Sequence, residues 1–296
     1  MKQSDFKFLQ NPLTKNWVIL APRRALRPDE AKGTVFSCPF CPQSTGEQEV
    51  YRVGGEPGDI NWQIKVVPNK FPFAPIHEII INSPDHEKSF AQLPLSQVEL
   101  VFKTYRQRFQ THKDKGQVYI FHNNGEKAGE SLPHPHTQLA VVPDDVTFDI
   151  PRLAIAQELD EVAKDQVVHE TEFLQLFCPK TSQWPDEVWV HPKRGGTYYS
   201  DITDEEIADL ALVFKRLVQI FTLRHGNEFP YNFYIYPGKD WYLRLIPRDK
   251  GLGGFEIGTG IFINTQDPVE TINFIKKHFN EGSESEIHTV DYGKSA

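Results

Sequence analysis

Two histidines and a glutamine at alternate positions form the segment of this sequence best suited to chemistry. His134, His136 and Gln138 lie in the run His-Pro-His-Thr-Gln, directly before the apolar residues 139–142. In a strand, alternate residues share a face, so these three side chains project together. An imidazole nitrogen can attack phosphorus and form a phosphoramidate, while a nearby amide donates to a phosphate oxygen. A metal-binding or structural His-x-His pair is an equally good interpretation of the spacing alone.

A glycine-bearing loop, residues 123–131, precedes the two histidines. Its glycines, Gly125 and Gly129, would let backbone N–H donors approach phosphate oxygens closely. The loop is therefore a candidate phosphate-binding element beside the predicted strand.

A second candidate for chemistry is the knuckle Cys38-Pro-Phe-Cys41, whose two thiolates can grip one metal ion from a tight turn. A redox pair is the competing interpretation, but such pairs usually open a helix, which Pro39 and Pro42 do not favour. A tetrahedral zinc ion needs two further ligands, and the knuckle does not choose among the 11 histidines. Since only one more cysteine is present, Cys178, a reducing compartment is expected rather than a disulfide framework.

Composition limits the class of partner. The net charge is −8, with 32 basic against 40 acidic residues, which argues against nucleic acid or an anionic membrane as the main partner. There is no apolar run of about 18 residues and no apolar core of a secretory signal at the N-terminus. A cytoplasmic location without membrane attachment is expected.

The elements that must position these residues occur twice in the same order. Capping boxes at residues 96–99 and 203–206 each open an amphipathic helix, and a helix–strand–loop–strand order follows in both places. Amphipathic helices resemble one another by chance, but the shared order favours duplication. A third helix is predicted from its cap Asp267 to about Phe279. The predicted strands are 118–121 and 139–142 in the first copy, and 231–236 and 241–246 in the second.

The segment FHNNGEKAGESLPHPHTQ, residues 121–138, resembles the active-site segment of the galactose-1-phosphate uridylyltransferase family, a branch of the histidine-triad superfamily. Further matches follow in order at residues 11–28, the Cys-Pro-Phe-Cys knuckle, and residues 67–72 and 83–86. The segment GFEIGTG, residues 254–260, resembles the ADP-glucose phosphorylase branch more closely. Together the matches extend over most of the chain.

The resemblance implies a ligand set for zinc. It assigns Cys38, Cys41, His86 and His134 to one structural ion that holds the active-site strand. Some relatives carry a second metal site in the repeated half, where this sequence has Tyr236, Tyr242 and Arg244. Phenols and a guanidinium do not replace imidazole ligands, so no second metal is predicted.

The resemblance also implies the catalytic and binding residues. It places His136 as the nucleophile, oriented by backbone carbonyls, and Gln138 as a donor to phosphate. The implied substrate-binding residues are Arg24, Arg27, Asn69, Phe71, Asn123, Gly129 and Ser131, together with Lys250, Phe255 and Glu256 in the segment that closes over the sugar.

The implied fold is α+β, with two fused histidine-triad-like halves, an antiparallel or mixed sheet and flanking helices. Residues 1–190 would form the half that carries the zinc knuckle and the active-site motif. Residues 191–296 would form a degenerate half that carries a sugar-binding segment. Because relatives with this fold are commonly dimers with sites at the subunit boundary, a homodimer is expected.

The implied function is that of a hexose-1-phosphate nucleotidyltransferase of galactose and carbohydrate metabolism. It would move a nucleoside monophosphate from a nucleotide sugar to a sugar-1-phosphate through a nucleotidyl-histidine, as a uridylyltransferase does. The alternatives are an ADP-glucose:phosphate adenylyltransferase that uses inorganic phosphate, a histidine-triad nucleotide hydrolase, and a non-catalytic nucleotide-binding protein. No glutamine follows soon after Glu256, where the uridylyltransferases carry one, so the identity of the sugar is left open.

Overall fold

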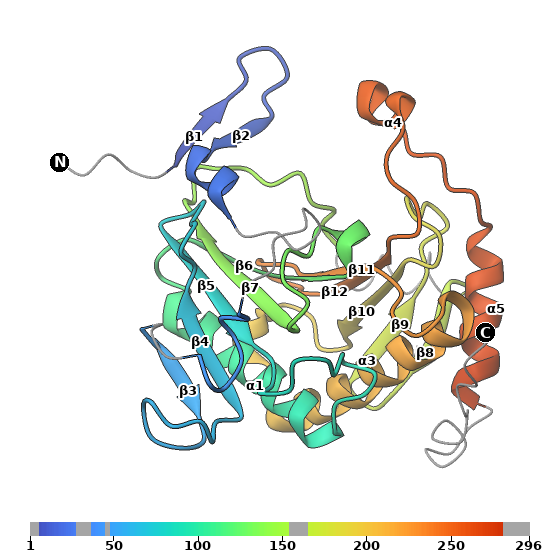
Figure 1. Cartoon of the computed structure of the whole chain (residues 1–296). Helices are drawn as coiled ribbons and strands as arrows, with labels where there is room; N and C mark the ends of the chain where they lie inside the picture. The colour runs from blue at the N-terminus through green and yellow to red at the C-terminus, as the bar shows by residue number, and fades with distance from the viewer. Residues whose placement is uncertain (1–5, 28–36, 45–47, 154–164, 281–296) are drawn as a thin grey trace, which may run out of the picture.

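The computed structural model describes residues 6–27, 37–44, 48–153 and 165–280. Its main sheet is built from β3 (Tyr51–Val53), β4 (Ile64–Pro68), β5 (Ile76–Ile81), β6 (Gln117–Asn124), β7 (His136–Val142), β8 (Val167–Glu170), β9 (Leu174–Phe177), β10 (Val188–Pro192), β11 (Tyr231–Ile235) and β12 (Leu243–Pro247). These 10 strands follow the order β3-β4-β5-β7-β6-β11-β12-β10-β9-β8 (Figure 1). Every strand pairing in the described residues is antiparallel, so of the two predicted kinds of sheet, antiparallel or mixed, the structure has the antiparallel one.

Helices cover one face of this sheet. The main helices are α1 (Leu95–His112), α3 (Asp204–His225), α4 (Gly254–Thr259) and α5 (Pro268–Asn280), with short 3-10 turns η1 (Pro22–Leu26), η3 (Glu126–Ala128) and η4 (Tyr199–Asp201). Figure 1 shows α1 and α3 together beneath the strands, while α5 lies along the edge at β8. A two-stranded hairpin, β1 (Lys7–Gln10) with β2 (Trp17–Leu20), stands apart from the main sheet.

The core lies between the sheet and the helices α1 and α3. The apolar face predicted for the first helix is buried, including Phe102, whose ring lies 5.5 Å from that of Phe214 on α3. Phe214 in turn packs on Phe233 of β11, with ring centroids 5.1 Å apart. Aromatic rings at these separations combine a large buried area with favourable edge contacts, so one core joins both halves of the chain.

The predicted helix starts are confirmed at two of three places. Thr203 caps α3 by accepting from the Glu206 N–H at 3.2 Å, and the Glu206 side chain accepts from the Thr203 N–H at 2.7 Å. Asp267 accepts from Val269 N–H at 2.9 Å at the start of α5. The box predicted at Ser96 is wrong, because α1 already begins at Leu95 and Pro94 takes the capping position. The Pro94 carbonyl accepts the first helical bonds, so Ser96 is inside the helix.

The predicted repeat has a counterpart in the strand order. The units α1–β6–β7 and α3–β11–β12 have the same sequence of elements, and β6 pairs with β11 at the centre of the sheet. The predicted boundary after residue 190 falls inside β10, so the two halves share one sheet and one core. Within the described residues, no helix is both long and apolar enough to cross a membrane.

Candidate active site

The ring of His136 lies at the start of β7, with one nitrogen held by the backbone. Its Nδ1 lies 2.9 Å from the carbonyl oxygen of His134. Since a carbonyl can only accept, Nδ1 carries the proton and the opposite nitrogen, Nε2, keeps its lone pair. The prediction that a backbone carbonyl orients this ring is therefore confirmed.

Burial keeps the same ring uncharged. It lowers the pKa of His136 to about 4; the bond to the His134 carbonyl acts in the opposite direction, and the charge of Arg27 lowers the pKa further. At neutral pH the ring is neutral, so Nε2 can form a new bond without first losing a proton.

A cavity of about 260 Å³ opens beside His136. Its walls are more apolar than polar and also carry several polar side chains, which is typical of small-molecule sites. The apolar wall includes Phe40, whose ring lies 5.1 Å from that of His136. Six of the predicted site residues line this cavity: Arg27, Asn69, Phe71, Ser131, His136 and Gln138.

The side chain of Gln138 follows His136 on the same face of β7. Its Oε1 lies 3.0 Å from Nε2 of His77 on the neighbouring strand β5. Its amide nitrogen makes no hydrogen bond with any residue that the structure describes, although the side chain lines the cavity. The amide therefore has N–H groups available to a ligand beside His136.

Two predicted arginines approach the cavity differently. Arg27 lines it, whereas Arg24 lies behind its wall. The Arg24 guanidinium donates to the carbonyl of Phe71 at 2.7 Å and lies 5.0 Å from the centre of the Phe73 ring. Arg24 therefore holds the wall in place, and Arg27 is the arginine that can meet a ligand.

The predicted loop residues Asn123 and Gly129 are held from the other half of the chain. Gly129 ends η3 with φ 86°, a left-handed conformation that favours glycine. The Asn123 amide lies 3.4 Å from the Gly129 carbonyl, a weak contact. Asn232 on β11 donates to Asn123 Oδ1 and to the carbonyl of Ala128, both at 2.8 Å. The second half thus supports the loop beside the cavity.

The four predicted metal ligands, Cys38, Cys41, His86 and His134, converge at one place. Their ligand atoms lie within 4.8 Å of one another. The sulfur–nitrogen separations are 3.3 Å from Cys41 to His86 Nδ1, and 3.7 and 3.8 Å from Cys38 and Cys41 to His134 Nδ1. A tetrahedral zinc ion, with bonds of roughly 2.3 Å to sulfur and 2.1 Å to nitrogen, separates its ligands by about 3.6 Å. The residues fit such an ion.

His134 connects the four metal ligands to the ring of His136. His134 Nε2 lies 2.9 Å from the carbonyl of Ser83, so that nitrogen donates and Nδ1 is left to bind metal. The carbonyl of the same His134 accepts from Nδ1 of His136. Burial raises the pKa of the Cys38 thiol to about 11, so metal binding there displaces a proton.

The predicted sugar-binding residues are not brought to this cavity within one chain. Lys250 donates to Thr265 at 3.1 Å, and Glu256 accepts from the backbone N–H of Gly253 at 3.1 Å. The Phe255 side chain is 53% exposed. Figure 1 shows α4, which carries Phe255 and Glu256, standing clear of the sheet. None of the three lines the cavity beside His136.

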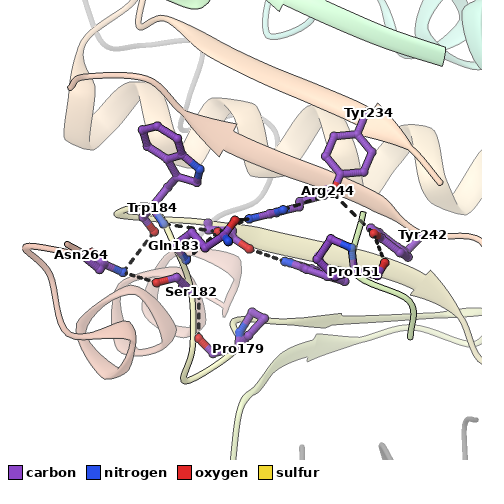
Figure 2. A network of polar contacts seen from close by, with 11 residues as sticks. Pro151, Pro179, Ser182, Gln183, Trp184, Tyr234, Tyr242, Arg244 and Asn264 are labelled. Carbon is purple, nitrogen blue, oxygen red and sulfur yellow. Dashed lines mark hydrogen bonds and ion pairs between the residues drawn. The ribbon is translucent and has the colours of Figure 1, made fainter. Parts of the chain in front are cut away.

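The repeat places a different set of side chains at the matching position of the second half. Across the sheet, Gln138 lies opposite Phe121, Phe121 opposite Tyr234, and Tyr234 opposite Arg244. If the two halves repeat about the centre of this row of four residues, Gln138 corresponds to Arg244. The residues two places earlier, His136 and Tyr242, then correspond to each other. Tyr242 is fully buried and donates to the Pro151 carbonyl at 2.5 Å (Figure 2). This position is therefore filled by a phenol without access to a ligand.

Arg244, the counterpart of Gln138 in the second half, is a buried cation. It donates to Glu187 at 2.8 Å. It also donates to Gln183 at 2.9 Å and to the Tyr234 hydroxyl at 3.2 Å (Figure 2). Its guanidinium also lies 5.2 Å from the centre of the Trp189 ring. A positive charge at this place suits a carboxylate partner and repels a metal cation. That no second metal binds here stays a prediction.

The Arg244–Glu187 pair leads to a prediction about stability. Replacing Glu187 by Gln leaves a buried guanidinium without its counter-ion, so the free energy of unfolding should fall by about 3–5 kcal/mol. The exposed pair Lys193–Glu170 offers a control, since Glu170→Gln should change it by less than about 1 kcal/mol. Urea unfolding of both variants measures this. Equal effects of the two substitutions would contradict the prediction.

Known proteins resemble this chain over nearly all of its length. Residues 75–141, which contain β5, β6 and most of β7, match the N-terminal domain of galactose-1-phosphate uridyl transferase. An ADP-glucose phosphorylase from Arabidopsis thaliana is 26% identical, over 90% of this chain and 92% of its own. A galactose-1-phosphate uridylyltransferase from Thermotoga maritima is 26% identical, over 90% of this chain and 96% of its own. The chain is related to the galactose-1-phosphate uridylyltransferase family.

The fold supports this relationship. The crystal structure of an ADP-glucose phosphorylase from Arabidopsis thaliana with bound ADP-glucose matches with a TM-score of 0.71 at 25% identity. The match covers 94% of this chain and 99% of that one. The predicted α+β fold is confirmed. The predicted resemblance to uridylyltransferases and to ADP-glucose phosphorylases is confirmed as well.

Sequence reasoning missed three residues that contact the candidate site residues. His77 bonds to Gln138, Asn232 bonds to Asn123, and Phe40 packs on His136. A signal existed only for His77, as a polar residue within the apolar run 76–81. Asn232 and Phe40 reach the site through strand pairing and loop packing, which no local pattern encodes.

Proposed function

We propose that this protein is a hexose-1-phosphate nucleotidyltransferase that moves a nucleoside monophosphate between a nucleotide sugar and an acceptor phosphate. The observation that carries the proposal is the ring of His136. Its Nδ1–H is held by the His134 carbonyl, which leaves a neutral Nε2 in the cavity wall beside the Gln138 amide. The relatives named galactose-1-phosphate uridylyltransferase and ADP-glucose phosphorylase support this class of reaction.

The reaction proceeds in two displacements at one phosphorus atom. In the first, the lone pair of His136 Nε2 forms a bond to the α-phosphorus of the nucleotide sugar. The bond from this phosphorus to the bridging oxygen breaks, and sugar-1-phosphate leaves with the electron pair. In the second, an oxygen of the acceptor phosphate attacks the same phosphorus, and the nitrogen–phosphorus bond returns its pair to Nε2. The His134 carbonyl stabilises the positive charge that the ring carries between the two steps.

The other cavity residues receive the substrate. The Gln138 amide donates to a non-bridging oxygen of the α-phosphate, where charge develops in the transition state. Arg27 and Ser131 bind the phosphates from the cavity wall, and Asn69 and Phe71 contact the nucleoside. The apolar wall excludes water from the phosphoramidate, which favours transfer over hydrolysis.

The metal of this enzyme is zinc in our proposal. A set of two cysteines and two histidines at tetrahedral separations is typical of structural zinc. When bound, zinc would neutralise the two thiolates and fix His134, whose carbonyl orients His136. Its role is structural, because all four positions around it are taken by protein.

A panel of substrates tests the proposed function. UDP-glucose and ADP-glucose are each incubated with galactose-1-phosphate or inorganic phosphate, and the nucleotide products are separated. One nucleotide sugar should give transfer to an acceptor, with no product from the acceptor alone. Release of nucleoside monophosphate at the same rate without any acceptor would instead identify a hydrolase.

A second candidate is ADP-glucose:phosphate adenylyltransferase, with the same histidine chemistry. The relative from Arabidopsis thaliana named ADP-glucose phosphorylase and the segment at residues 254–260 favour it. In the substrate panel it would appear as ADP formed from ADP-glucose and inorganic phosphate.

The position of α4 leads us to propose a homodimer in which one chain completes the cavity of its partner. The segment 250–263 carries the predicted sugar-binding residues away from its own cavity, and its apolar side chains face solvent. Ile257, Ile261 and Ile263 are 72%, 60% and 58% exposed. An exposed apolar group of this kind is more typical of an interface than of a free surface.

This arrangement predicts the effect of a surface substitution on mass and substrate affinity. Ile257→Ser together with Phe255→Ser should convert a dimer to a monomer in light scattering and raise KM for the sugar substrate about tenfold or more, since interface anchors contribute most of the binding free energy. Leu223→Ser, at an exposed leucine on α3, is the matched control and should stay dimeric. A wild-type protein that is monomeric at micromolar concentration would contradict the proposal.

A further inference from the structure

We infer that His77 is a positioning residue of the transfer reaction, acting through its hydrogen bond to Gln138. The inference rests on the proposed function and concerns a residue outside the predicted site. His77 lies on β5 and is only 4% exposed. Its Nε2 lies 3.0 Å from Oε1 of Gln138, which is 61 residues away in sequence and beside it in the sheet. It does not line the cavity itself, but its Nε2 contacts two residues that do, Gln138 at 3.0 Å and the side-chain nitrogen of Asn69 at 3.2 Å.

The protonated nitrogen of His77 follows from its contacts. The backbone N–H of Phe73 donates to Nδ1 of His77, with 3.4 Å between the two nitrogens. Burial lowers the pKa of His77 to about 3, with the bond to Gln138 opposing and the charge of Arg24 adding to the decrease, so the ring is neutral. A neutral imidazole has one N–H, and with Nδ1 accepting, that proton is on Nε2. Nε2 thus donates to Oε1 of Gln138, which can only accept, rather than accepting from the Asn69 side-chain nitrogen, which lies farther away at 3.2 Å.

This bond determines which end of the Gln138 amide meets the substrate. With Oε1 occupied by His77, the NH₂ group is the end left for the cavity. A phosphate oxygen accepts hydrogen bonds, so it is stabilised by the NH₂ group and repelled by a carbonyl oxygen. An unheld amide can present either end, because its two ends have nearly the same shape. His77 removes the wrong orientation before the substrate binds.

The ring of His77 also contacts the wall of the cavity, because its Nε2 lies 3.2 Å from the side-chain nitrogen of Asn69. Its backbone carbonyl accepts from the N–H of Asn69 at 2.8 Å, and its ring lies 4.2 Å from that of Phe73. Asn69 Oδ1 accepts from the N–H of Phe71 at 2.8 Å, which shapes the same segment. The segment that receives the nucleoside and the amide that receives the phosphate are therefore joined through one imidazole. Such support is what holds a donor at the precision that transition-state stabilisation needs.

The test uses four variants and measures kcat and KM for nucleotidyl transfer in the steady state. ADP-glucose and UDP-glucose are the probes, and the one that labels the wild type is used throughout. His77→Phe keeps the ring packing but removes the donor, and should lower kcat about 30- to 100-fold with KM changed less than about threefold. His77→Gln places an amide N–H near the lost one and should recover at least about tenfold of that loss. Gln138→Ala and the His77→Phe/Gln138→Ala double variant complete the cycle.

The double variant separates positioning from structural support. If His77 acts through Gln138, His77→Phe should have no further effect on kcat once Gln138 is alanine. His191→Phe is the matched control, since His191 is a buried histidine that also contacts a glutamine, Gln175, at 3.1 Å in the other half of the sheet. It should leave kcat unchanged. An undiminished effect of His77→Phe in the Gln138→Ala background, or wild-type kcat for His77→Phe, would overturn the inference while the proposed function stands. Failure of the wild type to form an adduct with either probe would overturn both.

Discussion

Replacing His136 with alanine is expected to lower nucleotidyl transfer by at least about 10⁴-fold, the scale seen when a covalent nucleophile is removed. The physical reason is that the Nε2 lone pair has no substitute in the cavity. The other polar groups of the cavity wall are amides, hydroxyls and the cations Arg27 and Lys70, none of which offers the lone pair of a neutral imidazole. Transfer from UDP-glucose or ADP-glucose to each acceptor, measured with purified protein of verified fold, gives the result.

The control for this variant is a histidine remote from the cavity. His169 lies on β8 at the far edge of the sheet, where its ring stacks 4.4 Å from that of Phe279. His169→Ala should keep wild-type activity. Retention of more than a hundredth of wild-type transfer in His136→Ala would show that another group forms the intermediate.

Loss of a metal ligand should have the next largest effect. Cys41→Ala removes a thiolate that lies between the two histidine ligands, at 3.3 Å from His86 and 3.8 Å from His134. The variant should contain no bound zinc, and its melting temperature should fall by about 5–10 °C. Loss of the metal should lower the free energy of unfolding by a few kcal/mol, and each kcal/mol lowers the melting temperature by roughly 2–4 °C in domains approaching this size. Activity should fall as well, since His134 would no longer be held in place to orient His136.

Cys178 provides the matched control for metal loss. It is buried in the main core and is remote from the cluster in the described residues. Cys178→Ala should keep one zinc per chain by elemental analysis, with only the modest loss of stability expected from a small core cavity. A full complement of zinc in Cys41→Ala would exclude the proposed ligand set.

Local patterns in the sequence predicted the elements that position the site. The alternation of His134, His136 and Gln138 indicated a strand, and β7 carries the latter two on one face. The capping box at Thr203 marked the start of α3, because a reciprocal pair of hydrogen bonds depends on residues three apart. Ser96 misled for the same local reason, since Pro94 offered the helix an earlier start that the box does not reveal.

The assignment of the site depended more on family resemblance than on spacing. The knuckle Cys38–Cys41 indicated a metal, but only the resemblance selected His86 and His134 from the other histidines. The structure brings these four together. It also separates the two histidines of the His-Pro-His run: His134 lies among the four metal ligands, and His136 lines the cavity.

Contacts across the sheet could not be predicted, because they depend on strand register. Whether His77 reaches Gln138 is decided by the pairing of β5 with β7, and a shift of one residue would turn it to the other face. The partner of Arg244 depends in the same way on the pairing of β10 with β12. The outward position of Phe255 depends on how the segments on either side of the short helix α4 place it, and the sequence offers no periodicity for these segments.

Mass spectrometry of the intact protein after incubation with a nucleotide sugar, without acceptor, tests the role of His136 most directly. One nucleoside monophosphate should be added per chain, peptide mapping should place it on His136, and the acceptor should remove it. Release of sugar-1-phosphate without any added mass, or a nucleotide attached to a different residue, would contradict the proposed mechanism.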